Sequence, residues 1–350
     1  MIDMYMFHND YNECCHPRIM ERMMQMQSVQ MQSYGLDTAC ADAAARIKKL
    51  CKNDRLFVHF LVGGTQTNLT VIAAALRPHH AVLGVQTAHI NVHETGSIEA
   101  TGHKIVALPS PDGKITANQI EKAAKDQLCD ESAEHVAKLK LVYISNSTEL
   151  GTIYTLSELE AISAICRKYG LYLFVDGARL SYALKAKDND VTLADLARLC
   201  DVFYMGGTKC GAMFGEAVVI SNPAIAEDFR YLIKQRGGML AKGWLLGLQF
   251  DVLLKDDLYF DIADHANRLA DQLRCTLESL GYQQLIINTT NQVFPILPNR
   301  LLESLGKEFT FTHQETIDDS HTAVRFCTSW ATTQESMDAL CAALKRLTVQ

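Results

Sequence analysis

Positive charge and long apolar runs are both scarce in this sequence. Its 350 residues carry 33 lysines and arginines against 40 aspartates and glutamates, which gives a formal net charge of −7. A nucleic-acid-binding surface needs clustered basic residues, so this balance argues against one. No apolar stretch reaches the roughly 18–20 residues of a membrane-spanning helix. The opening residues, MIDMYMFHND, lack a basic region and have a very short apolar segment, so we expect no signal peptide.

The sequence also lacks any CxxC motif, although it contains eleven cysteines. An odd number of cysteines without such spacing, in a chain of this length, indicates reduced thiols rather than a disulfide framework. We therefore expect a cytoplasmic protein in which most cysteines are small core residues. Cys210, which directly follows Lys209, is the one cysteine that we single out for a functional role.

Apolar residues, by contrast, make up 48% of the chain, enough for one large domain and a smaller one. From residue 56 onward, short apolar runs alternate with helical patterns. This alternation predicts an α/β fold in which a mostly parallel sheet is covered by helices on both faces. We place the large domain at 46–255. Its predicted strands are LFVHFLV (56–62), AVLGV (81–85), KIVALP (104–109), KLVYIS (140–145), LYLFV (171–175), VFYM (202–205) and EAVVI (216–220).

Two of the predicted helices carry start signals. In TANQIEKAAKDQ, Thr116 and Gln119 have the spacing of a capping box. In SELEAISAICRKYG, Ser157 and Glu160 have the same spacing, and Gly170 is a typical helix stop.

The two ends of the chain have different patterns. Residues 256–350 begin with a long helical pattern near 258–280 and continue with short strands and further helices, which predicts a small α+β domain. Residues 1–45 look helical and rich in methionine, with Pro17 at a plausible first helical position. We expect this segment to join the small domain or a subunit interface.

Two of the apolar runs are followed by a charged residue. Asp176 ends LYLFVD, and Lys209 ends VFYMGGTK. In open α/β sheets, ligands bind outside the carboxyl ends of the strands, so both side chains should reach one site. Gly177 and Gly206 would allow close approach of backbone to a ligand or to a neighbouring strand. The alternative is a buried Lys–Asp ion pair, which is costly without further partners.

A third segment narrows the chemistry. Gly63, Gly64 and Thr65 form a turn between a strand and a helix, and the start of a helix can bind phosphate through its free N–H groups. An amine that can form a Schiff base, a carboxylate that keeps a ring nitrogen protonated and a phosphate site together match pyridoxal phosphate.

A side chain that covers the cofactor ring is also expected. His89 follows the predicted strand at 81–85 and could stack on the ring. The competing interpretations are a core or surface histidine and a metal site, because His89, His93 and Glu94 lie close in sequence. The order HxxxHE differs from the HExxH of a zinc protease, and no third ligand is apparent, so we predict no metal.

With these features the sequence resembles a known family, the threonine aldolase branch of the β-eliminating lyases, within the fold-type I pyridoxal-phosphate enzymes. The resemblance covers nearly the whole chain, and the combination of its two strongest motifs is highly specific. The matching stretches are VDGAR (175–179), GGTK (206–209), GGTQTN (63–68), AHINVHETG (88–96), VRFCTSW (324–330) and NDY (9–11).

The resemblance implies a role for each candidate residue. Lys209 would hold the cofactor as a Schiff base, Asp176 would bind the pyridine nitrogen, and His89 would stack on the ring. For the phosphate, the expected contacts are Gly64, Thr65 and Thr208. For the substrate, they are Asn9, Arg179, which would also lie near the ring hydroxyl, and Arg325, which would bind the substrate carboxylate through two hydrogen bonds.

Two positions depart from the family pattern. The family has a Thr-His-Asn stretch where this chain has Ser147-Thr148-Glu149, so the histidine expected near the substrate's β-hydroxyl is missing. The family arginine of the GGMRQ stretch is replaced by Leu240, with Arg236 and Lys242 as possible substitutes.

The activity implied by the resemblance is cleavage of a β-hydroxy-α-amino acid, such as threonine, allo-threonine or phenylserine, to glycine and an aldehyde. The base at the β-hydroxyl would be His89, Glu149 or a water held by His93, and the sequence does not choose among them. The alternatives are β-elimination, racemisation or transamination with the same cofactor, or a non-catalytic member that binds it. The resemblance also implies a homodimer or homotetramer.

Overall fold

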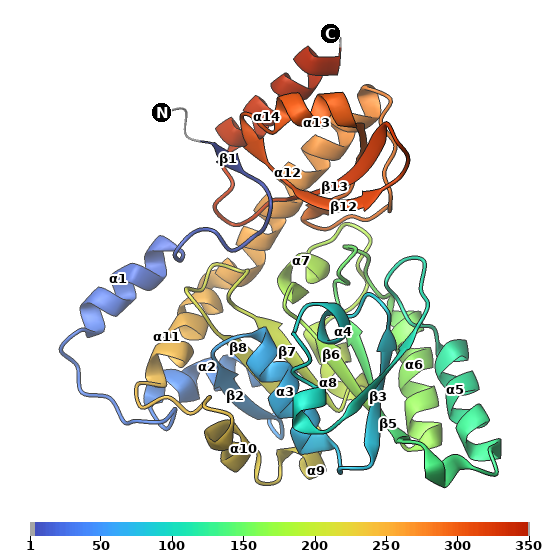
Figure 1. Ribbon diagram of the computed structural model, residues 1–350. Coiled ribbons are helices and arrows are strands. Elements are labelled where there is room, and N and C mark those ends of the chain that lie inside the picture. Colours follow the sequence, from blue (N-terminus) through green and yellow to red (C-terminus); the bar gives the residue numbers. More distant parts are fainter. Residues whose placement is uncertain (1–3, 349–350) are drawn as a thin grey trace.

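A seven-stranded sheet forms the centre of the computed structural model, which describes residues 4–348 (Figure 1). Its strands in spatial order are β2 (Phe57–Leu61), β8 (Glu216–Ile220), β7 (Val202–Gly206), β6 (Tyr172–Asp176), β5 (Lys138–Ser145), β3 (His80–Val85) and β4 (Lys104–Leu108). The strands from β4 to β7 run parallel, and β8 runs antiparallel to both of its neighbours. The predicted α/β fold with a mostly parallel sheet is therefore confirmed.

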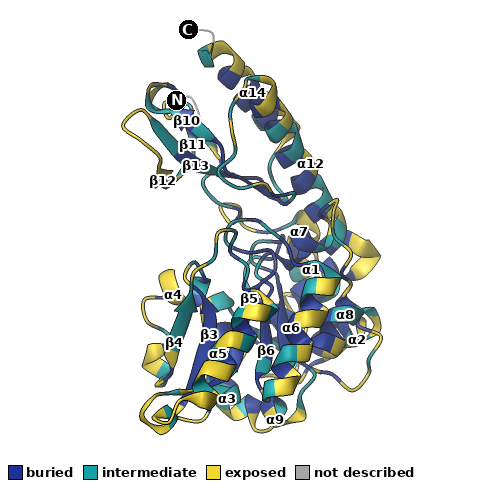
Figure 2. Cartoon of the chain, turned by 90° about the vertical axis from the view of Figure 1, so that its right-hand side faces the viewer, coloured by how far each residue is buried: buried dark blue, intermediate teal, exposed yellow. Residues whose placement is uncertain are grey.

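Helices pack around this sheet. They are α2 (Thr38–Leu50), α3 (Gly64–Ala75), α4 (His89–Val92), α5 (Ala117–Cys129), α6 (Leu156–Tyr169), α7 (Leu180–Leu184), α8 (Leu193–Leu199), α9 (Pro223–Ala226), α10 (Phe229–Gln235) and α11 (Trp244–Leu253), with 3-10 turns at Glu99–Thr101, Ala133–His135 and Lys255–Asp257. The strands between them are mostly buried, whereas the outer faces of α5 and α6 are exposed (Figure 2). This division is what continuous apolar strands and amphipathic helices require.

The start of α6 differs from the prediction. Thr116 and Gln119 do form the expected capping box of α5. In α6, however, Thr155 and Glu158 form the capping box, so the predicted pair Ser157 and Glu160 is wrong. The sequence TLSELE contains two overlapping matches to the same pattern, two residues apart, and spacing alone cannot choose between them. The helix ends before Gly170, as expected, because this glycine adopts a left-handed conformation with φ of 63°.

A small α+β domain lies above the large one in Figure 1, and the long helix α12 (Leu258–Ser279) joins the two. Its remaining elements are β9 (Gln292–Val293), β10 (Ile296–Pro298), α13 (Asn299–Leu305), β11 (Phe309–Thr310), β12 (Thr312–Thr316), β13 (His321–Cys327) and α14 (Gln334–Thr348). The boundary between the two hydrophobic cores falls within α12. Ala266 belongs to the core of the large domain, and Leu269 belongs to the core of the small one.

The N-terminal segment contacts both domains. Strand β1 (Tyr5–Met6) pairs with β11 of the small domain, so the first and the last described elements, β1 and α14, both belong to that domain. Helix α1 (Pro17–Met26) begins at Pro17, as predicted, and packs beside α11 of the large domain (Figure 1). None of the helices between residues 4 and 348 combines the length and apolar character needed to cross a membrane.

Candidate active site

A cavity of about 320 Å³ lies at the carboxyl ends of the parallel strands. It brings together residues that are far apart in the sequence, because they lie at the ends of four different strands, β2, β3, β6 and β7. Of the predicted site residues, Gly64, Thr65, His89, Asp176, Arg179, Thr208 and Lys209 line it. The position agrees with the rule that open α/β sheets bind ligands at this edge.

Asp176 is a buried carboxylate that accepts four hydrogen bonds. The hydroxyls of Tyr143 and Tyr204 donate to its two oxygens, each at 2.5 Å, and Asn68 Nδ2 and the Ala178 N–H donate at 3.1 and 3.0 Å. Burial alone would raise the pKa of Asp176, but the charge of His89 and these hydrogen bonds outweigh it and lower the pKa. The side chain is therefore ionised at neutral pH.

Two glycines fix the distance between the strand ends that carry Asp176 and Lys209. A Cβ on Gly177 would lie 1.8 Å from the carbonyl oxygen of Tyr204, and one on Gly206 would lie 2.3 Å from that of Ala178. Any side chain at either position would push β6 and β7 apart. The close approach expected from these glycines is thus an approach of one strand end to the other.

Lys209 is half-buried and lines the cavity. Burial, and then the positive charge of Arg179, lower its pKa, which favours the neutral nucleophilic form. Its Nζ lies 5.9 Å from the centre of the Tyr11 ring. The neighbouring Cys210 is buried against Ser181, and burial raises the pKa of its thiol to about 12, so it is not a reactive cysteine.

His89 is held by the loop that follows it. Its Nδ1 lies 2.7 Å from Oε1 of Glu94, and Glu94 is itself buried and bonded by Asn68 and Ser97. The contact with Glu94 fixes the orientation of the His89 ring through Nδ1 and does not involve Nε2. No group of three or more histidine, cysteine or carboxylate side chains in residues 4–348 is arranged to hold a metal ion.

Helix α3 begins directly at the cavity wall. Gly63 is its N-cap and has no side chain to satisfy the first N–H groups, so these remain available to an anion. Thr208 also lines this region, but its hydroxyl lies 2.9 Å from Oε1 of Glu216. Glu216 was missed by the sequence analysis, although a charged residue at the start of the buried strand EAVVI is a signal for it.

A second cavity of about 600 Å³ adjoins the first and shares five of its lining residues: Tyr11, His89, Glu149, Arg179 and Lys209. Arg325 lines this second cavity. Its Nη2 donates to the His8 carbonyl at 3.2 Å, and its Nε is buried without a hydrogen-bond partner in the described part of the chain. An unpaired buried donor of this kind fits a site for a substrate carboxylate.

Arg179 is already paired within the protein. Its Nε and Nη2 donate to the two oxygens of Asp10 at 2.7 and 2.9 Å, and Asn291 donates to the same carboxylate at 2.9 Å. Asn9 accepts a hydrogen bond from the Tyr11 N–H at 3.0 Å and is not among the residues that line either cavity. Within the NDY stretch, Tyr11 lines both cavities, and Asp10 reaches the site only through its ion pair with Arg179.

Glu149 stands where the two cavities meet. The Ser145 hydroxyl and the His89 N–H both donate to its Oε1, at 2.7 and 3.1 Å. Burial, and then the charge of Asp176, raise its pKa. A carboxyl with a raised pKa and one oxygen not used by these bonds can both accept and return a proton.

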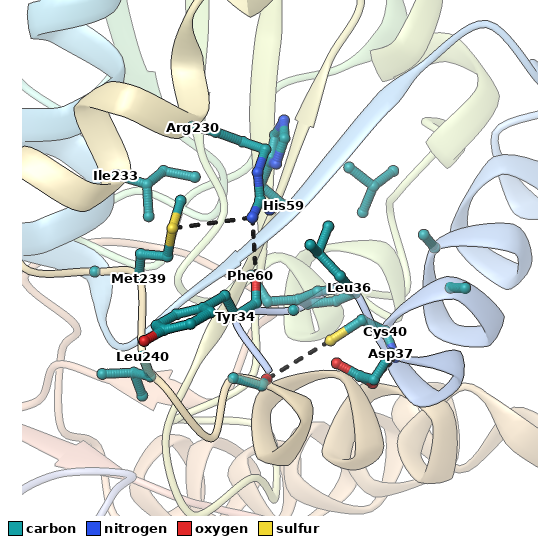
Figure 3. A pocket seen from close by; sticks show the side chains of 16 residues that line it. Tyr34, Leu36, Asp37, Cys40, His59, Phe60, Arg230, Ile233, Met239 and Leu240 are labelled. Atoms are coloured by element: carbon teal, nitrogen blue, oxygen red, sulfur yellow. Dashed lines mark hydrogen bonds between the residues drawn. The ribbon is translucent and has the colours of Figure 1, made fainter. Parts of the chain in front are cut away.

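Leu240, which replaces the family arginine, lines a different cavity of about 410 Å³ (Figure 3). There Arg230 Nη2 donates to the Tyr34 carbonyl at 3.1 Å and lies 3.9 Å from Met239 Sδ. Gln66, in the first turn of α3, donates to the Arg236 carbonyl at 3.2 Å. The segment that contains Arg236 therefore packs against the start of α3, but neither Arg236 nor Lys242 is among the residues that line the two active-site cavities.

The residues present fit pyridoxal phosphate. An ionised Asp176 suits a protonated ring nitrogen, a lysine amine of lowered pKa suits covalent attachment, and the uncapped start of α3 suits a phosphate. Fold and site together define a pyridoxal-phosphate-dependent enzyme of fold type I.

A family comparison agrees with this class, because a model of the beta-eliminating lyases matches residues 15–298. The chain belongs to this family. It is 31% identical to the low specificity L-threonine aldolase of Pseudomonas aeruginosa, over 95% of this chain and 94% of that one. The threonine aldolase of Leishmania major is 48% identical and superposes with a TM-score of 0.96 over 98% of this chain and 99% of that one. A mutant aspartate aminotransferase of Thermus thermophilus, 15% identical with a TM-score of 0.71 over 99% and 92% of the two chains, shares the fold alone.

Proposed function

We propose that the enzyme cleaves β-hydroxy-α-amino acids such as threonine, allo-threonine or phenylserine to glycine and an aldehyde. The 48% identical relative is a threonine aldolase, and its structure matches along nearly the whole chain. The observation that carries the proposal is the pair of adjoining cavities. One has the groups that suit the cofactor, and the other presents Arg325 opposite the shared residues Lys209 and Glu149.

Each residue of the first cavity would hold one part of the cofactor. Pyridoxal phosphate, when bound, supplies the electron sink that accepts the pair left by the broken Cα–Cβ bond. Lys209 would attach it, Asp176 would keep its ring nitrogen protonated, and His89 would cover its ring. Gly64, Thr65 and Thr208 would contact the phosphate.

Arg325 would set the orientation of the substrate. Within residues 4–348 its Nε has no hydrogen-bond partner and its guanidinium is in no ion pair, whereas Arg179 already pairs with Asp10. A carboxylate held by a planar guanidinium fork has its direction fixed as well as its position. This orientation decides which bond at Cα is cleaved, because only a correctly aligned bond reacts.

Glu149 would take the proton from the β-hydroxyl. It lines both cavities, so it can reach a side chain held between Lys209 and Arg325. His89 is less suited to this task because its ring is tied to Glu94. His93 lines only the second cavity and is largely exposed, and partial desolvation, followed by the charge of His89, lowers its pKa.

The test is a substrate panel with the purified, cofactor-loaded enzyme. Threonine, allo-threonine and phenylserine should each be assayed for glycine and aldehyde. Release of pyruvate-type keto acids and ammonia would instead indicate β-elimination, and exchange with a keto acid would indicate transamination. If the cofactor is bound but none of the three amino acids gives glycine, the aldolase assignment is wrong.

The enzyme would act as a homodimer or homotetramer. Helix α1 buries Ile19 and Met26 but leaves Met20 and Met24 exposed, at 42% and 67%. Tyr231 of α10 is 77% exposed. Large apolar side chains that are exposed in this way suit a subunit contact. Light scattering after size-exclusion chromatography would measure the oligomeric state, and a monomer at micromolar concentration would contradict the proposed homodimer or homotetramer.

The eleven free cysteines suit a reducing compartment such as the cytoplasm, which is where the enzyme would act.

A further inference from the structure

A buried carboxyl group forms part of the wall of the cofactor cavity, on the side of the Gly63-Gly64-Thr65 turn. Glu216 is 3% exposed and begins β8, opposite Leu61 of β2 and Gly206 of β7. Its Oε2 accepts from the Gly207 N–H at 3.0 Å, and its Oε1 lies 2.9 Å from Thr208 Oγ1. A negative charge here would lie beside the group that the cavity suits best, a phosphate dianion, so the protonation of Glu216 matters.

The hydroxyl of Thr208 has a single hydrogen to donate. It already accepts a hydrogen bond from the Gly215 N–H at 3.1 Å. If Glu216 is ionised, Thr208 must donate that hydrogen to Oε1, because a carboxylate can only accept. If Glu216 is protonated, its own O–H can donate to Thr208 Oγ1 over the same distance. The hydrogen of Thr208 is then free to point into the cavity.

We propose that Glu216 is a positioning residue for the cofactor phosphate, because only its protonated form lets Thr208 donate a hydrogen bond to that phosphate. Glu216 does not touch the reacting atoms. It acts through Thr208, and it couples phosphate binding to the uptake of one proton. The inference rests on the assignment of the cofactor and not on the identity of the amino-acid substrate.

The surroundings of Glu216 favour the protonated form. Burial raises its pKa to about 8, although the bonds from Thr208 and Gly207 and the charge of Lys209 oppose this. Asp176, at the end of β6, adds to the increase. The other titratable groups near it are Tyr204 on β7, Cys210 after β7 and Tyr259 on α12. A bound phosphate, with a charge near −2 above its second pKa of about 6, would favour the neutral acid further.

The test compares two ligands that cannot form a Schiff base with Lys209: pyridoxine 5'-phosphate and pyridoxine. Both affinities are measured for the cofactor-free full chain by fluorescence titration near pH 7 and near pH 9.5. If Glu216 has a pKa of about 8 and must be protonated when phosphate binds, the ratio of the affinity for pyridoxine 5'-phosphate to that for pyridoxine should fall by up to about 30-fold between pH 7 and pH 9.5. Titration of Lys209 should change the affinities for both ligands alike, so its effect cancels in the ratio of the two affinities. A ratio that stays constant overturns the proposal, and so does failure of the phosphate ligand to bind more tightly than pyridoxine at either pH.

Two variants test the route through Thr208. Glu216→Gln keeps an acceptor for Gly207 and places an N–H permanently toward Thr208, so it should abolish the pH dependence of the ratio and keep tight phosphate binding. Thr208→Val should weaken phosphate binding near pH 7 and make the two ligands respond to pH alike, with or without Glu216→Gln. If Glu216→Gln keeps the full pH dependence, Glu216 is not the group responsible. None of these measurements uses an amino acid, so absence of aldolase activity would leave their outcome unchanged.

Discussion

Replacing Glu149 with glutamine should separate the chemistry of the β-hydroxyl from the rest of the reaction. Glutamine has the same size and can keep its Oε1 as the acceptor for Ser145 and the His89 N–H. The position of the second oxygen, where the two cavities meet, is then taken by an amide that cannot accept the proton. The fold and the bound cofactor should therefore remain intact, with the free energy of unfolding changed by about 1 kcal/mol or less.

The expected size of the effect follows from this loss of a positioned base. General base catalysis accounts for roughly 10²–10⁴ in rate, so kcat/KM for threonine should fall by this factor. That factor corresponds to about 3–5 kcal/mol of the activation barrier. The wild-type rate should also decline as the pH drops through the raised pKa of Glu149, because the base must be ionised to accept a proton. The variant should lack this decline.

The assay pairs two reactions of the same site. Threonine cleavage is followed through the aldehyde product, and exchange of the α-proton of glycine with deuterium oxide is followed by NMR. Glycine has no hydroxyl, so Glu149→Gln should retain exchange while it loses cleavage. His93→Asn serves as the matched control for the competing base and should keep most of the cleavage. The reasoning is refuted if Glu149→Gln cleaves threonine at near wild-type rate, or if it loses exchange as completely as cleavage.

Three further substitutions have defined outcomes. Asp176→Asn removes a buried charge beside the ring nitrogen and should lower kcat for threonine by roughly 10²–10³-fold, while a reduced adduct at Lys209 still forms with borohydride. Arg325→Lys replaces a planar fork by a point charge and should raise KM for threonine about 10–100-fold, with a smaller change in kcat. Gly177→Ala places a Cβ 1.8 Å from the Tyr204 carbonyl and should destabilise the fold by about 3 kcal/mol or more, seen as a lower melting temperature. An unchanged kcat for Asp176→Asn, an unchanged KM for Arg325→Lys or an unchanged melting temperature for Gly177→Ala would contradict the corresponding assignment.

The parts of the site that sequence could predict are those set by local patterns. Asp176 and Lys209 each follow an apolar run that had to be a buried strand, and parallel strands bring their carboxyl ends to one edge. The Gly63-Gly64-Thr65 turn lies between a strand and a helix, so its place at the same edge followed as well. Glycines at strand ends pointed correctly to a close approach.

Contacts between distant segments lay beyond such reasoning. Asp10 and Arg179 are separated by 169 positions, and no periodicity in either segment reveals that they pair. Glu216 stands out in the sequence as a charged residue at the start of a buried strand, but its contact with Thr208 follows only from the antiparallel pairing of β7 and β8. The start of α6 shows the same limit on a smaller scale, because two overlapping capping patterns could not be ranked by spacing alone.

The carboxylate of Asp10 links three stretches of the chain, since it is bonded both by Arg179 and by Asn291, 281 positions further on. A ribosome makes roughly 5–20 residues per second, so Asp10 emerges tens of seconds before its last partner. The large sheet can fold during that interval, but the wall that carries Tyr11 cannot be completed. Nascent chains and C-terminally truncated fragments that lack Asn291 should thus be unable to complete the wall that carries Tyr11.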